Sequence, residues 1–228
     1  MKYFNVAARW LFILCLPLLL LTASISCAVN SLWLYERGFE KYDISSATGL
    51  AGPELEKTAR GLISYFNSSQ EFIEITVEKD GQPFTLFNQR EVIHLKDVKD
   101  LFRLDYLVLL GTLIYALGYG GASLFRHRGR YWQQLARGVV SGAGITLAVM
   151  LALGLGTLVG FDRLFWQFHL ISFANDFWLL DPARDYLIML FPQGFWYDAT
   201  LFIALGAALV AVILGGLAGG HLLLNKKT

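Results

Sequence analysis

The stretch FDRLFWQFHLISFANDFWLLDPARDYLIMLFPQGFWYD, from Phe161 to Asp198, mixes aromatic and ionisable side chains between two long apolar segments. Aromatic side chains with one polar end suit the boundary between membrane and water. An ionisable group at that boundary is costly unless it is paired, so it is a functional candidate. The alternative is an interfacial loop that an aromatic belt anchors. The polar residues of the stretch from Phe161 to Asp198 include Asp162, His169, Asn175, Asp176, Asp181, Arg184 and Asp185.

The composition of the 228-residue chain is too apolar for an ordinary soluble domain, with 55% hydrophobic residues and a mean hydropathy of +0.49. A net charge of +1 gives no basic field, so we expect no nucleic-acid partner. Cys15 and Cys27 both fall in the first apolar segment, where they are predicted to be packing residues. No CxxC or HExxH motif occurs, and we expect neither a metal nor a cofactor.

Four apolar segments are predicted to cross the membrane as helices, over 10–30, 104–125, 138–160 and 197–224. The first also resembles a signal peptide, but its apolar run is long and continues past Cys27, which favours an uncleaved helix. Short basic segments stay in the cytoplasm. Both chain ends and the loop 126–137 are therefore predicted inside, with 31–103 and 161–196 outside. The basic residues that decide this are Lys2, Arg9, Arg126, Arg128, Arg130, Arg137, Lys226 and Lys227.

Small residues in the third and fourth segments predict a tightly packed bundle, because they let helix backbones approach closely. No segment carries a run of charges at its centre, which argues against an ion channel or a proton pump. The glycines concerned are Gly142, Gly144, Gly154, Gly156, Gly160, Gly215, Gly216, Gly219 and Gly220.

The polar block 31–103 is predicted to fold as a small α+β extracytoplasmic domain. Pro53 marks the start of a helix whose apolar stripe runs from Leu55 to Phe66. Asp80-Gly81 predicts a β-hairpin turn between strands over 72–77 and 84–87. The predicted fold class is thus an α-helical membrane protein, a four-helix transmembrane bundle with a small α+β domain containing a hairpin.

The predicted topology brings two of the four histidines to one interface. His94 precedes the second membrane segment and His169 follows the third, while His127 and His221 fall on the cytoplasmic side. A histidine pair at that depth suits general acid–base work on a lipid ester. A metal site ranks lower, because the spacing matches no standard motif. No GxSxG motif occurs, so the nucleophile would come from substrate or water.

The segment 88–100, read as a helix, places His94 and Asp97 on one face, where a carboxylate can orient the imidazole. The alternative is a solvated amphipathic helix that leads into the membrane. The polar partners available to the histidine pair are Arg90, Asp97, Asn175, Asp176, Asp181 and Arg184.

The sequence resembles the bacterial lipoprotein intramolecular transacylase family over nearly its whole length. One block that carries the resemblance is Asn88-Gln89-Arg90-Glu91-Val92-Ile93-His94-Leu95-Lys96-Asp97-Val98-Lys99. A second is Phe168-His169, Phe173, Trp178, Asp181-Pro182, Asp185 and Phe191-Pro192, and a weaker one is Tyr42, Thr48-Gly49 and Glu54-Leu55.

The resemblance implies a multi-pass enzyme of the bacterial cytoplasmic membrane, acting among membrane lipids on a diacylglyceryl-modified lipoprotein. The family moves the sn-2 acyl chain of the glyceryl group onto the α-amine of the N-terminal cysteine, giving lyso-form lipoprotein. Its two functional histidines fall on His94 and His169, and we expect His169 to be the base.

We expect the substrate or the histidine pair to be held by Arg90, Asp97 and Asp181, and the acyl path to be shaped by Trp178. Interfacial charges also pair merely to close loops, which is the alternative for each of these residues. Two other functions stay open from the residues: an interfacial lipid-ester hydrolase that uses water, and a non-catalytic envelope partner protein.

Overall fold

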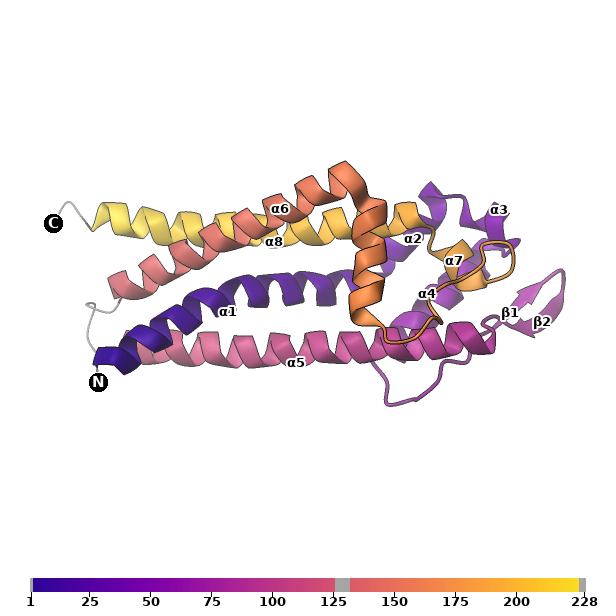
Figure 1. Cartoon of the computed structure of the whole chain (residues 1–228), viewed down its shortest axis with the longest axis horizontal. Helices are drawn as coiled ribbons and strands as arrows, with labels where there is room; N and C mark the ends of the chain where they lie inside the picture. The colour runs from indigo at the N-terminus through magenta and orange to yellow at the C-terminus, as the bar shows by residue number, and fades with distance from the viewer. Residues whose placement is uncertain (1, 126–131, 226–228) are drawn as a thin grey trace. The chain divides into compact units, whose positions relative to one another are not determined.

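The computed structural model describes residues 2–125 and 132–225. Within these residues, four helices are long and apolar enough to cross a membrane (Figure 1). They are α1 (Lys2–Val29), α5 (Gln89–Phe125), α6 (Trp132–Ser172) and α8 (Gln193–Leu224). The prediction of four apolar spanning helices is confirmed. Several basic residues used to orient them, and His127, lie outside the described residues: Arg126, Arg128, Arg130, Lys226 and Lys227.

The chain divides into two compact units. The first, which we call the span unit, comprises Met1–Ser26, Asp105–Leu155 and Phe202–Thr228. The second, the site unit, comprises Cys27–Leu104 and Gly156–Leu201, and it contains both His94 and His169.

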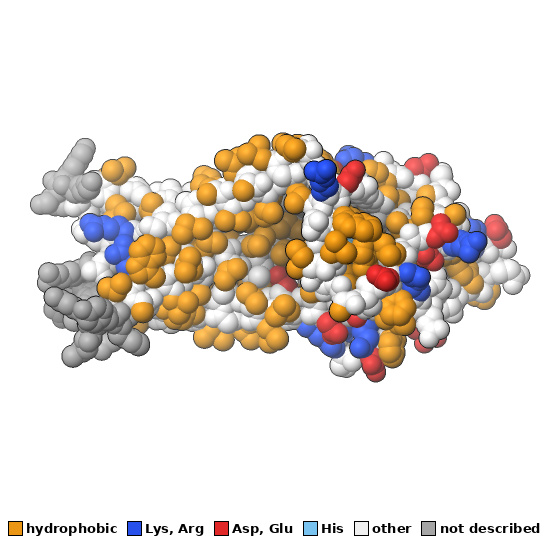
Figure 2. Space-filling view, viewed as in Figure 1, with side chains coloured by type: hydrophobic (Ala, Val, Ile, Leu, Met, Phe, Trp, Pro, Cys, Tyr) orange, Lys and Arg blue, Asp and Glu red, His pale blue; other side chains and the backbone are white. Residues whose placement is uncertain are grey.

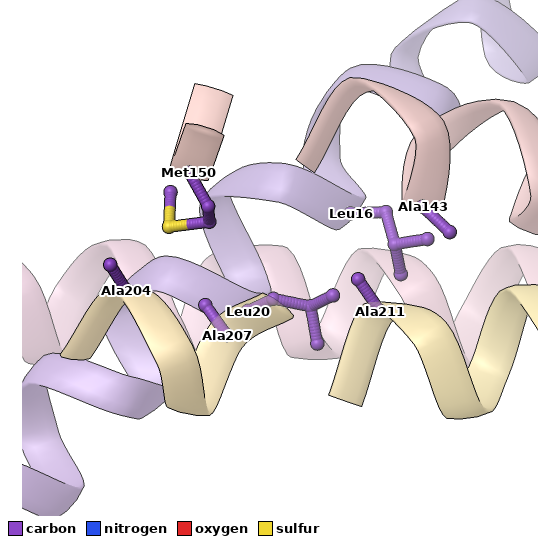
Figure 3. Packing of buried hydrophobic residues seen from close by; sticks show 7 residues of the cluster. All are labelled: Leu16, Leu20, Ala143, Met150, Ala204, Ala207 and Ala211. Atoms are coloured by element: carbon purple, nitrogen blue, oxygen red, sulfur yellow. The ribbon is translucent and has the colours of Figure 1, made fainter. Parts of the chain in front are cut away.

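The span unit is held together by small residues packed against leucines of α1. Leu16 and Leu20 meet alanines and a methionine of α6 and α8, as Figure 3 shows for Ala143, Met150, Ala204, Ala207 and Ala211. A Cβ at Gly142 would lie 2.8 Å from the Leu16 side chain, so a glycine permits this approach. Gly144 and Gly216 face open space instead, so only part of the predicted glycine pattern packs helices. Figure 2 shows apolar side chains over much of the visible face of these helices.

The site unit contains short elements that precede α5. They are α2 (Leu32–Lys41), α3 (Ile44–Thr48), α4 (Gly52–Phe66), β1 (Thr76–Lys79) and β2 (Gln82–Thr85). Helix α4 has proline in its first turn and buries Leu55, Leu62 and Phe66, which confirms the helix predicted there. A further short helix, α7 (Tyr186–Leu190), lies between α6 and α8 in the chain.

The predicted hairpin is confirmed, although its strands are short. Strands β1 and β2 pair antiparallel, from Thr76 opposite Thr85 to Lys79 opposite Gln82. Asp80 and Gly81 form the two-residue turn with φ angles of 54° and 71°, as a type I′ turn requires. The first strand was expected from Phe72 but begins only at Thr76. Ile73 and Ile75 are nevertheless buried, and the Leu86 amide donates to the Ile75 carbonyl oxygen at 2.9 Å, so one hydrogen bond continues beyond the end of the ladder.

The loop predicted over 161–196 is helical in its first third, since α6 continues to Ser172. Non-helical angles at Gly160 (φ −170°, ψ 64°) mark a kink between the spanning part of α6 and this extension (Figure 1). Phe161, Phe165 and His169 recur every four residues and stack along one face, which is a helical period. Because aromatic residues occupy many other positions of this stretch, the four-residue spacing does not stand out in the sequence. After Ser172 the chain is irregular up to α7.

Candidate functional site

His94 lies in the second turn of α5, where it is 7% exposed. Its ring meets Phe173 edge to face, with centroids 4.9 Å apart. Its Nδ1 atom is buried and finds no hydrogen-bond partner among the described residues. Because buried polar atoms are nearly always paired, this nitrogen marks a place where a polar group of a ligand could bind.

His169 lies in the part of α6 that follows the Gly160 kink, and it is 8% exposed. Its Nδ1 lies 2.7 Å from the carbonyl oxygen of Phe165, one turn earlier. A carbonyl oxygen can only accept, so Nδ1 carries the proton and donates it. In the neutral ring, Nε2 is then left with a lone pair, which is the form a general base requires.

The two imidazoles lie close to each other. Their ring centroids lie 6.1 Å apart, with an angle of 30° between the planes. Phe173 contacts both rings, at 4.9 Å from His94 and 5.5 Å from His169. The proximity expected from topology is therefore present in the structure, across 75 positions of sequence.

Aromatic side chains surround His169 on several sides. Phe165 lies 4.4 Å from its ring centroid, Trp178 4.9 Å and Phe168 5.4 Å. Trp166 packs behind Trp178 at 4.8 Å. The walls are therefore largely carbon, and electrostatic interactions within such a site are stronger than in water.

Arg90 and Asp97, two of the predicted helpers, hold the segment that follows α6. Asp97 accepts a hydrogen bond from the Asn175 side chain at 2.8 Å. The Arg90 guanidinium donates to the backbone oxygen of Asp176. Both contacts tie α5 to the residues just before Trp178, so these helpers shape one wall of the site.

The other two predicted helpers differ from each other. Trp178 is in direct ring contact with His169. Asp181 is exposed, and its contacts stay within one turn: it accepts from the Ala183 amide at 2.9 Å and lies 3.7 Å from Arg184. The structure therefore brings Trp178 to the histidine pair and gives Asp181 the contacts of a loop residue.

Two buried carboxylates were not among the helpers predicted for the histidine pair, although Asp185 was named as a polar member of the stretch 161–198. Glu91 is 1% exposed and accepts from the backbone amides of Asn88 (2.8 Å) and Leu187 (2.6 Å). Asp185 is 8% exposed and accepts from the Asn88 side chain (2.8 Å) and the Asp181 amide (2.7 Å). The signal for Glu91 was its position three residues after Asn88, the spacing of a capping box. Only the structure gives the contact to Leu187.

A cavity of about 450 Å³ lies at the Gly160 kink and does not include the histidines. Its wall contains Asp162 and Gln193, which share a hydrogen bond of 2.6 Å. Phe161 lines the cavity and stacks on Phe165, which in turn contacts His169. Nowhere in residues 2–125 and 132–225 do three His, Cys, Asp or Glu side chains gather as metal ligands would.

Comparison with known proteins relates most of the chain to one family. A family model described as lipoprotein intramolecular transacylase Lit matches residues 10–196. An uncharacterized protein of Aquifex aeolicus is 30% identical over 146 residues, which is 61% of each chain, so this chain spans about three fifths of that relative.

The fold is shared with solved structures. The membrane-integral lipoprotein intramolecular transacylase of Bacillus cereus superposes with a TM-score of 0.79 at 19% identity, over 100% of this chain and 99% of the other. A form of that protein with a histidine replaced by arginine gives a TM-score of 0.77, over 99% and 95% of the two chains. The fold predicted from the sequence is confirmed.

Proposed function

The chain belongs to the lipoprotein intramolecular transacylase family of membrane acyltransferases, and from this premise we propose that it forms lyso-form lipoproteins. The substrate is a diacylglyceryl-modified lipoprotein with a free α-amine on its N-terminal cysteine. The reaction moves the sn-2 acyl chain of the glyceryl group onto that amine. The observation that carries the proposal is the buried histidine pair, with one ring fixed so that Nε2 offers a lone pair.

In the proposed mechanism the substrate supplies the nucleophile. An α-amine has a pKa near ~8, so a useful fraction is neutral at physiological pH. Its nitrogen attacks the sn-2 ester carbonyl and forms the new C–N bond, and His169 Nε2 accepts the proton that the nitrogen loses. His94 donates an N–H to the oxygen that becomes negative. As the C–O bond breaks, His169 returns its proton to the sn-2 oxygen, leaving an amide and a free hydroxyl.

The surroundings of the pair support this assignment. The aromatic walls exclude most water from both rings, which are 7% and 8% exposed. Holding amine and ester together can lower the activation barrier by on the order of 7–11 kcal/mol at best, so no protein nucleophile is required. Arg90, Asp97 and Trp178 shape the wall next to His169, and that wall is where we place the acyl chain. For Asp181 the loop contacts favour a structural role.

We propose the cytoplasmic membrane as the location, with membrane lipids around the spanning helices and both chain ends in the cytoplasm. The site unit then faces outward, where lipoproteins are anchored. This orientation rests on the distribution of basic residues along the sequence.

The test is a mass spectrum of the N-terminal tryptic peptide of one abundant lipoprotein. The host strain lacks its own N-acylating enzymes and expresses the wild type, His94→Ala, His169→Ala or His221→Ala. We expect N-acyl, S-monoacylglyceryl peptide from the wild type and from His221→Ala, the control, since His221 lies on α8 in the span unit. Loss of the general base lowers the rate by about 10²–10⁴-fold and loss of one donor to the oxyanion by about 10²–10³-fold, so both site variants should leave diacylglyceryl peptide.

Two outcomes contradict the proposal. Diacylglyceryl peptide that is unchanged by the wild type argues for a non-catalytic envelope partner. Released fatty acid without an N-acylated product argues for a hydrolase that uses water.

A further inference from the structure

Glu91 joins two elements from different parts of the chain, one of which, α5, carries His94. One carboxylate oxygen accepts from the Asn88 amide at the start of α5, and the other accepts from the Leu187 amide in α7. The two partners lie 99 positions apart in sequence. At 1% exposure the carboxylate is shielded from water, and hydrogen bonds to a charged acceptor are stronger than neutral ones.

A second connection reinforces the first. The Asn88 side chain donates to Asp185 at 2.8 Å while its oxygen accepts from the amides of Arg90 (2.9 Å) and Glu91 (3.2 Å). The other oxygen of Asp185 accepts from the Asp181 amide. The first turn of α5 is thereby joined to the segment 181–187 by charge-assisted hydrogen bonds to the carboxylates of Glu91 and Asp185.

His94 lies one helical turn after Glu91, where residues three apart are neighbours on the helix surface. Its ring has no hydrogen bond of its own at Nδ1, and its packing partner Phe173 belongs to the same irregular stretch that leads to Asp185. The orientation of His94 therefore depends on the α5 turn and on that stretch. Glu91 connects the α5 turn to Leu187, in the helix that directly follows the stretch.

We infer that Glu91 is a positioning residue, which fixes His94 by joining the start of α5 to α7. It does not touch the reacting atoms. The role assigned to His94 rests on the proposed function, whereas the position of its ring can be measured without any turnover. An experiment on the ring itself therefore separates the two.

The experiment treats the purified full-length protein in detergent with diethyl pyrocarbonate, which modifies neutral imidazoles. Mass spectrometry follows the rates at His94 and at His221, the internal reference. Glu91→Gln keeps the side-chain volume but turns one acceptor into a donor facing the Asn88 amide. We expect His94 to react about tenfold faster or more, because losing one charge-assisted hydrogen bond makes local opening of the structure around His94 that much more frequent. The rate at His221 should not change.

The matched control is Glu54→Gln. Glu54 also accepts from the amide of a distant residue, Glu78 at 3.1 Å, but its contacts lie in α4 and β1. The Glu54→Gln variant should leave the modification rate of His94 at the wild-type value. In a turnover assay we expect Glu91→Gln to lower kcat roughly 10- to 100-fold with KM nearly unchanged, because misplacing a catalytic group by about 1 Å has effects of that order.

An unchanged His94 rate in folded Glu91→Gln overturns the inference, as does an equal rise at His94 and His221. Should Glu91→Gln unfold, Asn88→Ala provides the second test, since it breaks the connection to Asp185 from an exposed position. It too must raise the rate at His94 alone. If the rates behave as expected in a protein without transacylase activity, the positioning role stands and the proposed function fails.

Discussion

Gly194, in the first turn of α8, packs against the ring of Tyr42, and an alanine there would disturb a small polar cluster. A Cβ at Gly194 would lie 2.5 Å from Cε1 of Tyr42 and 2.8 Å from its hydroxyl oxygen. That hydroxyl donates to Asp198 at 2.9 Å, and Lys41 binds the same carboxylate oxygen at 2.6 Å. Contacts below 3.0 Å cannot persist, so Gly194→Ala must displace the ring and break its hydrogen bond.

The magnitude follows from three contributions to the free energy of unfolding. Overpacking a well-filled site lowers it by about 1–3 kcal/mol. The lost hydrogen bond lowers it by about 1 kcal/mol, since Asp198 keeps Lys41. The better helix propensity of alanine offsets about 1 kcal/mol. The net loss is about 1–3 kcal/mol, which at roughly 2–4 °C per kcal/mol lowers Tm by roughly 2–12 °C.

The assay is thermal unfolding in detergent of the wild type, Gly194→Ala, Tyr42→Ala and the double variant. In the Tyr42→Ala background the added methyl group has space, so it should lower Tm no further. Gly216→Ala, on the same helix with no atom within 4 Å of the added Cβ, is the control and should not lower Tm. An unchanged Tm for Gly194→Ala, or an equal fall in both backgrounds, would refute the reasoning.

Two further substitutions test the packing of each unit. Gly142→Ala places a Cβ 2.8 Å from a leucine side chain of α1 and 3.1 Å from a backbone oxygen, so it should lower Tm, whereas Gly144→Ala, which meets open space, should not. Equal effects of the two would contradict close helix packing at Gly142. Lys99, 1% exposed, donates to a backbone carbonyl at 2.6 Å and to a serine hydroxyl at 3.1 Å. Lys99→Ala removes both hydrogen bonds and should lower the free energy of unfolding by about 1–3 kcal/mol in denaturant titrations. Lys96→Ala breaks an exposed ion pair of 3.8 Å and a contact with an aromatic ring at 6.0 Å, and should have an effect below about 1 kcal/mol. A loss for Lys96→Ala as large as that for Lys99→Ala would contradict the importance of the buried contacts.

The spanning helices and the hairpin were accessible from sequence because their signals are local. Long apolar runs need no partner to be recognised, and Asp80-Gly81 specifies its own turn through two positive φ angles. The approach of His94 to His169 followed from the predicted topology, since they flank spans that follow one another in the chain, one just before its span and one just after.

Long-range polar contacts were not accessible in the same way. Glu91 stands in a charged run that is typical of a solvated helix, and its burial depends on a backbone amide 96 positions away. The kink at Gly160 could not be predicted from the presence of a glycine, because other glycines of α6, including Gly144 and Gly154, have helical backbone angles. A glycine pattern predicts close packing, but it does not say which member interrupts the helix.

The carbon-lined surroundings of His169 have a consequence for the identity of the product. On the proposed reaction two nucleophiles compete for one ester: bulk water, and an amine tethered to the same molecule. The tethered amine acts at an effective molarity of about 10⁵–10⁸ M once it is aligned, while water must reach imidazoles that are more than nine-tenths covered. We therefore expect Phe165, Phe173 and Trp178, whose rings contact His169, to set the ratio of hydrolysis to acyl transfer. These side chains carry no acid or base, yet on the proposed reaction we expect them to favour an amide over a free fatty acid.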